Sequence, residues 1–291
     1  MPREPEPSTI QREFVLGALK EKMRVDGRGL LQGREPMLKF SEQELGVVEC
    51  ALGKTRVLAA VQATIGRPRP DRPFEGTFTI FSEISPMASP YFEAGGKPSE
   101  EEIAITRMLE KVLKRSDAVD REALCIVAGQ RVWHLTLTLH FLADSGNMLD
   151  CACLAGIAAL KHFRKPDVEV VGDEVTIHDP ADRAPVPLSV HHIPICVSFV
   201  FADDDPQPII DPTHLEALLL PSNLAIALTH LSSSTAPTLC VLHKAGGIAL
   251  SFDEITACVD IAVRRARELA GWLEEEIERD WKGRKALVEV V

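Results

Sequence analysis

Two carboxylates that stand close together in the chain, Asp211 and Glu216, could do chemistry as a pair. They follow the apolar run 207–210, which reads as a strand, so we expect them at a strand end. Two converging carboxylates can hold Mg²⁺ or act as general acid and general base. The simpler interpretation, which we favour, is a strand end followed by a turn, in which Asp211 accepts backbone hydrogen bonds ahead of Pro212.

Two basic elements could bind phosphate groups. One is the loop 66–73, where prolines alternate with arginines and exclude regular structure, because proline lacks a backbone donor and fixes φ. The other is a helix face on which cations recur at positions i, i+4 and i+7. The residues are Arg67, Arg69 and Arg72 in the loop and Arg107, Lys111 and Lys114 on the helix. These six are our candidates for contacts with a nucleic-acid backbone. For the helix set, pairing with Glu110 and nearby acids as ordinary surface remains the alternative.

No other motif in the chain predicts a metal or cofactor site. The glycine-lysine-threonine at 53–55 mimics the end of a phosphate loop, but the glycine needed five residues earlier is Val48, so we predict a hairpin turn. Cys151 and Cys153 are two apart on an expected helix, so they point about 200° apart and cannot chelate one ion together. The aspartates at 203–205 are interpreted as a solvated hairpin turn.

Strands and helices must position these residues. The predicted strands are 47–52, 56–64, 77–83, 131–142, 193–201, 207–210, 224–230 and 238–243. The predicted helices begin at the capping box of Ser8 and Gln11 (with Ile10, Phe14 and Ala18 at helical spacing), at Pro98 in a first turn, at Leu149, and at the capping box of Ser251 and Glu254. The helix 149–163 is apolar nearly all round, so it should be buried on most sides.

These elements predict an α/β (α+β) chain with two βαβ-type layers, each a mixed sheet packed on helices. We expect an N-terminal tail and helix over 1–26, a first domain over 27–165, a second domain with a C-terminal helix over 188–291, and between the domains a crossover over 166–187. The crossover is placed at a segment that contains prolines and acids.

Composition narrows the function classes. The chain of 291 residues has a formal net charge of -11, whereas a protein that binds nucleic acid over its whole surface is usually basic. Any nucleic-acid contact would therefore be local or shared with partners. No apolar run approaches the ~20 residues that span a bilayer, and the first residues show no signal-like apolar run. The seven cysteines sit mostly in apolar segments, which favours reduced, buried thiols.

Several motifs resemble the RNase PH family. KMRVDGR at 22–28 and LGKTRVL at 52–58 look like the opening of the family's domain, and GNMLDCA at 146–152 resembles a turn of its non-catalytic exosome branch. GDEVTI at 172–177 and PVPLSVHHIPI at 185–195 are similar to a core subunit of the eukaryotic RNA exosome. The resemblance covers roughly residues 8 to 282 and implies the RNase PH fold.

The resemblance also implies what chemistry is missing. Active members phosphorolyse RNA from its 3′ end, with a glycine-threonine-arginine turn and helix arginines for phosphate, and two aspartates six apart for Mg²⁺. Here Met148 or Leu149 stands at the arginine's place in the turn, and Ala217 stands six residues after Asp211, with Glu216 beside it. Arg107 is kept, while Lys111 and Lys114 replace helix arginines, and lysine lacks the planar fork that grips phosphate.

The resemblance therefore implies a non-catalytic, structural subunit without cofactor. Its implied partners are other RNase PH-like subunits in a six-membered ring, RNA-binding cap subunits, hydrolytic exoribonucleases, and single-stranded RNA in the central channel, in the nucleus, the nucleolus and the cytoplasm. Two alternatives stay open at this point. One is a phosphate-dependent 3′-to-5′ exoribonuclease that uses Asp211 and Glu216, and the other is a small-molecule enzyme on the same fold.

Overall fold

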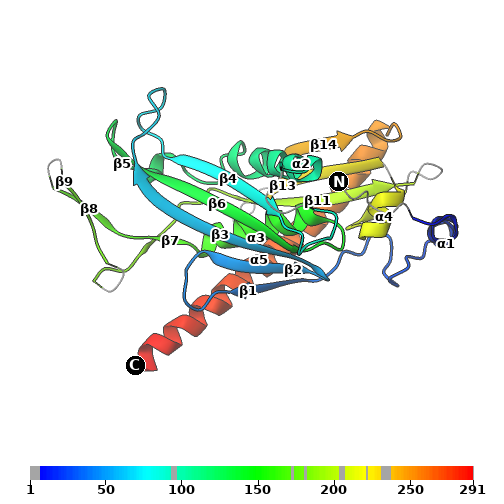
Figure 1. The fold of residues 1–291 in the computed structure, drawn as a ribbon, viewed down its shortest axis with the longest axis horizontal. Coiled ribbons are helices and arrows are strands. Elements are labelled where there is room, and N and C mark those ends of the chain that lie inside the picture. The colour runs from blue at the N-terminus through cyan, green and yellow to red at the C-terminus, as the bar shows by residue number, and fades with distance from the viewer. Residues whose placement is uncertain are drawn as a thin grey trace.

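Two β-sheets stacked around a buried central helix make up the body of the protein (Figure 1). The structure is a computed structural model, and it describes residues 7–92, 97–171, 174–179, 182–202, 207–220, 222–230 and 237–290. The central helix is α3 (Met148–His162), and it packs against strands of both sheets. Nearly every residue of α3 is buried, as its all-round apolar sequence predicts, and its alanines allow close packing on the sheets. Among the described residues, no helix has the length and apolar character needed to cross a membrane.

The first sheet is mixed. Its strand order is β1 (Pro36–Phe40), β2 (Val47–Leu52), β3 (Thr55–Gly66), β6 (Arg131–Ala143) and β4 (Thr77–Ile84), and β5 (Cys125–Val127) pairs with β6. β4 runs parallel to β6, and the other pairs are antiparallel. β2 and β3 are joined by a two-residue turn at Gly53 and Lys54, so the predicted hairpin is confirmed.

The second sheet has the order β12 (Ile209–Ile210), β11 (Ile193–Phe201), β13 (Ser222–His230) and β14 (Thr238–Ala245). Its described strands are all antiparallel, so the prediction of a mixed sheet holds for the first sheet and is wrong for the second. β11 and β12, and likewise β13 and β14, are joined by short connections that suit antiparallel pairs, whereas a parallel pair needs a long crossover.

Two short strand pairs lie within or beside the expected crossover. β7 (Arg164–Lys165) pairs with β10 (Val186–Pro187), and β8 (Val168–Val171) pairs with β9 (Glu174–Ile177). The β8–β9 pair projects from one end of the body (Figure 1). The crossover therefore contains a hairpin that its proline- and acid-containing sequence did not predict.

The N-terminal helix α1 (Thr9–Lys20) has the predicted capping box, in which Ser8 and Gln11 bond to each other's backbone. Val15 and Leu19 are buried, whereas Ile10 and Phe14 are exposed, because α1 lies at the end of the body and contacts it with an adjacent stripe.

The helix after β4, α2 (Glu100–Leu109), is capped by Ser99, so Pro98 precedes the helix and is not in its first turn. It continues as a π-helical turn, η1 (Glu110–Lys114), in which the N–H of Arg115 bonds to the carbonyl of Glu110 at 2.9 Å. The other short helices are η2 (Glu122–Leu124) and α4 (His214–Leu219).

The C-terminal helix α5 (Phe252–Val290) begins at the predicted capping box of Ser251 and Glu254 and packs along β11 and β13. Residues 281–284 of this helix also contact the body, before its last residues project beyond it (Figure 1). Trp281 lies beside His162 and 4.5 Å from the guanidinium of Arg164, and Arg284 donates to the carbonyl of Ser41 at 2.6 Å.

Candidate functional site

The carboxylate of Asp211 is surrounded by donors. Arg34 binds it through Nε at 2.8 Å, Nη2 at 2.6 Å and its own backbone N–H at 2.8 Å, and Nη1 of Arg28 adds an ion pair at 2.8 Å. Asn147 donates to it at 2.7 Å. Burial alone would raise the pKa of Asp211, but the hydrogen bonds and charge of Arg34 outweigh burial and hold the pKa at about 2. Asp211 is therefore a carboxylate already satisfied by the chain itself.

Glu216 has a separate arginine partner. Arg24, which is almost fully buried, binds the Glu216 carboxylate through Nε at 2.9 Å and Nη2 at 2.5 Å. The same carboxylate accepts the backbone N–H of Thr213 at 2.8 Å and so caps α4. Arg24 also donates to the backbone carbonyl of Asp211 at 2.9 Å, which ties the two ion pairs together.

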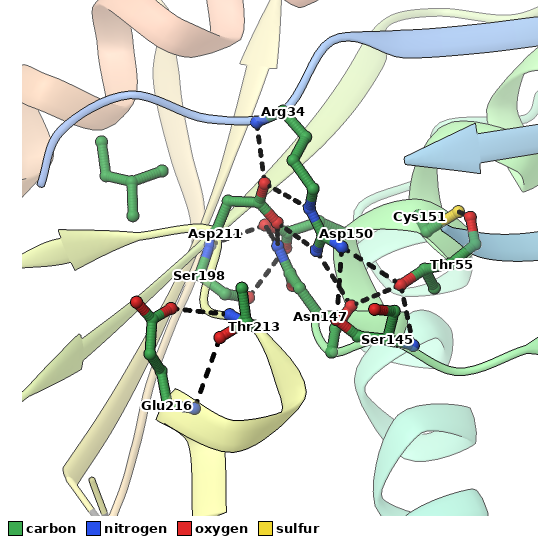
Figure 2. Close-up of polar contacts among 12 residues, drawn as sticks. Arg34, Thr55, Ser145, Asn147, Asp150, Cys151, Ser198, Asp211, Thr213 and Glu216 are labelled. Atoms are coloured by element: carbon green, nitrogen blue, oxygen red, sulfur yellow. Dashed lines mark hydrogen bonds and ion pairs between the residues drawn. The ribbon is translucent and has the colours of Figure 1, made fainter. Parts of the chain in front are cut away.

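The two carboxylates are thus directed at different arginines and do not converge. Figure 2 shows Asp211 beside Arg34 and Asn147, while Glu216 turns away toward Thr213 on α4. Within the described ranges, no group of three or more acidic, histidine or cysteine side chains could hold a metal ion. The geometry does not support the alternative in which Asp211 and Glu216 form a catalytic or metal-binding pair.

The turn ahead of α3 completes this polar cluster. The carbonyl of Gly146 accepts from Thr55 Oγ1 at 2.8 Å and from Arg34 Nη2 at 2.9 Å. Gly146 has φ +90°, and a Cβ there would lie 2.3 Å from the backbone N of His214, so only glycine lets the turn approach the segment before α4. The N-cap of α3, Asn147, also has a left-handed backbone, with φ 56°.

Asp150 fixes α3 to the second sheet. Its carboxylate accepts from the backbone N–H of Ser198 at 2.9 Å, from Ser198 Oγ at 2.8 Å and from Asn147 at 2.8 Å. Complete burial raises the pKa of Asp150 to about 6 despite these hydrogen bonds. Asp150 therefore joins the two layers and is not open to a ligand.

A cleft of about 280 Å³ lies next to the turn, between α2 and the second sheet. Met148 and Leu149 line it, as do the carboxylates of Glu101 and Asp144. Asp144 pairs with His214 at 3.2 Å, and that contact together with the Gly146 N–H lowers the pKa of Asp144 although burial would raise it. Among the described residues that line the cleft there is neither lysine nor arginine, so it offers poor charge complementarity to phosphate.

The structure brings part of the basic loop and part of the basic helix together. Arg72 and Lys114 line one depression of about 370 Å³, and Arg115 and Arg121 line it as well. Acids moderate this charge. Each of three cations forms an ion pair with an acid. The pairs are Arg72 with Glu75 at 3.0 Å, Lys114 with Glu110 at 3.8 Å and Arg121 with Asp117 at 2.7 Å.

The helix candidates lie around different depressions. Lys111 lines a second depression of about 410 Å³, which borders β14, and Arg107 lines neither depression. The π-helical turn explains the difference, because it inserts an extra residue per turn and rotates the side chains that follow. Arg115, which lines both depressions, connects them.

In the loop, Arg67 and Arg69 are exposed, and neither forms an ion pair with any residue that the structure describes. Sequence reasoning missed Arg121 as a member of the basic surface. Its position could not be read from periodicity, because it lies in the irregular segment between η1 and η2 and reaches Arg72 through their common partner, Glu75.

The remaining predicted residues behave as structural groups. Cys151 and Cys153 are buried, free thiols, and burial raises the pKa of Cys153 to about 12, so neither is a thiolate at neutral pH. The aspartates at 203–205 lie outside the described residues, so that prediction stays a prediction.

Comparisons with known proteins agree with the fold. The 3′ exoribonuclease family matches the chain in two parts, domain 1 over residues 32–166 and domain 2 over residues 192–265. The exosome complex component rrp45 of Schizosaccharomyces pombe is 40% identical over 280 residues, which are 96% of this chain and 94% of that protein. The RRP45 component of Homo sapiens is 39% identical over 96% of this chain, but the chain spans only 62% of that protein. A solved structure of the Archaeoglobus fulgidus exosome with RNA bound to the active site is similar at a TM-score of 0.75, with 29% identity over 90% of this chain and 97% of that one.

Proposed function

This chain belongs to the 3′ exoribonuclease family of RNase PH-like proteins, and we propose that it is a non-catalytic, structural subunit of an RNA exosome ring. In this role it supports 3′-to-5′ processing and degradation of RNA, including ribosomal RNA maturation and messenger RNA turnover. It contacts single-stranded RNA and leaves the cutting to other subunits.

The observation that carries the proposal is that arginines of the same chain bind both carboxylates, Asp211 and Glu216, at the expected reaction site. Asp211 is neutralised by Arg28 and Arg34, and Glu216 is neutralised by Arg24. A carboxylate already bound by a guanidinium in a buried setting has no free charge for Mg²⁺.

The adjacent cleft supports the same conclusion. Phosphorolysis needs positioned cations around the attacking phosphate, because the charge that develops must be stabilised by groups already in place. Here Met148 and Leu149 stand in the turn, and Glu101 and Asp144 would repel an anion. Loss of several such groups together should abolish turnover.

The basic surface is the proposed RNA contact. It comprises the loop candidates Arg67, Arg69 and Arg72, the helix candidates Arg107, Lys111 and Lys114 with Arg115 beside them, and Arg121, which lines the same depression as Arg72 and Lys114. Phosphate contacts are sequence-independent and fit a channel that must pass any RNA. The net charge of -11 does not conflict with this, because a ring can divide basic and acidic surfaces among its subunits.

The proposed partners are the other RNase PH-like subunits of a six-membered ring, RNA-binding cap subunits and hydrolytic exoribonucleases. The proposed locations are the nucleus, the nucleolus and the cytoplasm. The similarity to exosome components of two organisms and to an archaeal exosome structure supports the ring.

The test is native mass spectrometry of the tagged chain purified from its source cells, with RNA degradation by the same sample measured with and without phosphate. A large hetero-oligomer whose activity ignores phosphate is the expected result. A monomer or homo-oligomer that releases nucleoside diphosphates only with phosphate would instead make this chain the enzyme. In that case Asp211→Asn should abolish the release.

A further inference from the structure

An exposed phenylalanine stands in the basic loop. Phe74 follows Arg72 and Pro73 in the loop between β3 and β4, and 64% of its surface is exposed. A single exposed apolar side chain is common on protein surfaces, but this one stands in a loop that also carries three arginines. We infer that Phe74 is a stacking platform for an unpaired base of RNA bound along this loop, an inference that rests on the RNA contact proposed above.

The backbone on both sides of Phe74 is fixed. The carbonyl of Pro73 accepts the N–H of Gly129 at 2.9 Å, and the N–H of Gly76 donates to the carbonyl of Arg121 at 2.8 Å. Gly76 is wedged so tightly that a Cβ would lie 2.4 Å from Cβ of Leu124. The loop therefore cannot fold Phe74 back onto the sheet without breaking these contacts.

The side chain next to Phe74 is fixed as well. The Glu75 carboxylate bridges Arg72 at 3.0 Å and Arg121 at 3.3 Å. An aromatic ring presented from a rigid loop loses little conformational entropy when a flat group stacks on it, since few rotatable bonds remain to be ordered. Phe74 is thus pre-organised for contact with a planar ligand.

The surroundings favour a nucleobase over a protein surface. Exposed Arg67 and Arg69 stand in the same loop without a described acidic partner, and the depression lined by Arg72, Lys114 and Arg115 adjoins it. In the described loop 67–76, Phe74 is the one large apolar side chain that is exposed, and its neighbours in the sequence are arginines, prolines and acids, not an apolar patch. Cations that track phosphates, interleaved with an aromatic ring on which bases stack, are the usual combination in single-strand binding.

Stacking makes a distinct prediction from charge. A base on an aromatic ring contributes enough that removing the ring weakens binding by roughly 5- to 100-fold, and it does so without changing the number of phosphate contacts. Phe74→Ala should therefore lower RNA affinity at every salt concentration and leave the slope of log K against log salt unchanged. Arg67→Glu combined with Arg69→Glu should lower both the affinity and the slope.

The experiment uses the reconstituted exosome core that contains this chain, with anisotropy titration of a labelled oligoadenylate and of a matched strand whose bases are replaced by abasic sites. Phe74→Ala is expected to weaken binding of the oligoadenylate and to leave binding of the abasic strand unchanged. Phe74→Trp, which keeps an aromatic ring, is expected to bind the oligoadenylate as tightly as the unaltered core. Phe252→Ala, which removes an exposed phenylalanine at the start of α5, is the matched control and should change neither.

The outcomes separate the two proposals. If the double arginine variant binds both strands as tightly as the unaltered core, the loop does not contact RNA, and the RNA contact and the stacking fail together. If that variant is weak but Phe74→Ala binds like the unaltered core, the RNA contact stands and the stacking is wrong. If native mass spectrometry shows that the assembly with Phe74→Ala lacks a subunit, the Phe74 side chain contacts a neighbouring protein subunit, and the inference is overturned.

Discussion

Asn147 donates a hydrogen bond of 2.7 Å to Asp211, and both residues have left-handed backbones, with φ 56° and 51°. A left-handed conformation costs a non-glycine residue on the order of 1 kcal/mol or more, so two in contact require compensation. Arg34 supplies it, because its guanidinium binds the Asp211 carboxylate and the carbonyl of Gly146 next to Asn147. One arginine thus holds together the turn before α3 and the end of β12.

Replacing Asp211 should therefore affect stability and not catalysis. In Asp211→Asn, Arg34 keeps its charge in a largely buried site without its carboxylate partner, while Arg28 retains its ion pair with Asp26. Breaking such a pair from one side costs about 3–5 kcal/mol. Urea unfolding followed by tryptophan fluorescence should show a loss of this size. Asp71→Asn, on the exposed loop, is the control and should change little. A variant as stable as the unaltered chain would contradict a structural role for Asp211.

The same ion pair predicts a pH dependence. The pKa of Asp211 is about 2 in the folded chain against its ordinary 3.8, so the folded state binds this proton less tightly than the unfolded state. From that difference, ionised Asp211 contributes roughly 2 kcal/mol to the free energy of unfolding. This contribution is fully present above about pH 5 and is lost as the pH falls from about 4 to about 2. The difference in unfolding free energy between the unaltered chain and Asp211→Asn should therefore be constant from pH 7 to pH 5 and shrink below pH 4. A difference that grows on acidification would have the wrong sign.

Gly146 offers a steric test of the turn. In Gly146→Ala the new Cβ would meet the backbone of Thr213 and His214 at 2.3–2.4 Å, at a φ of +90° that alanine disfavours. We expect a loss of more than about 2 kcal/mol in unfolding free energy. The matched control is Gly17→Ala in α1, where nothing lies within 4 Å of the new Cβ. That change should stabilise by up to about 1 kcal/mol. Equal effects at both glycines would show that the turn has room.

Much of the fold follows from local sequence rules, and the site does not. The capping boxes at Ser8 and Ser251, and the strand 193–201, appear as predicted, because each depends on neighbours in the chain. The partners of Asp211 could not be predicted, since Arg34 lies 177 positions away and only the tertiary fold brings it close. The π-helical turn after α2 likewise depends on packing, and it moved Lys111 and Lys114 into different depressions.

Restoring an arginine to the turn should not restore phosphorolysis. Leu149→Arg would place a cation at the cleft, next to Met148. The carboxylates of Asp211 and Glu216 would still be bound by arginines, so no Mg²⁺ could be recruited. We expect no release of nucleoside diphosphates from RNA in the presence of phosphate and Mg²⁺. Measurable phosphate-dependent release by this variant would show that the turn alone had silenced the site.

The far end of α5 offers a test of whether this helix belongs to the body. Trp281 contacts the ring of His162 and lies 4.5 Å from the Arg164 guanidinium. Trp281→Ala should remove that packing, cost roughly 2 kcal/mol and free the helix end, because the half-buried ring is its main apolar contact there. Hydrogen exchange of the amides over 275–284 should accelerate.

Two variants serve as controls. Trp281→Phe should keep the protection of these amides, since the indole Nε1 is buried without a partner and its loss costs nothing. Lys282→Ala, with a side chain 78% exposed, should behave like the unaltered chain. Unchanged exchange in Trp281→Ala would mean that Arg284 and its contact with Ser41 suffice to hold the helix.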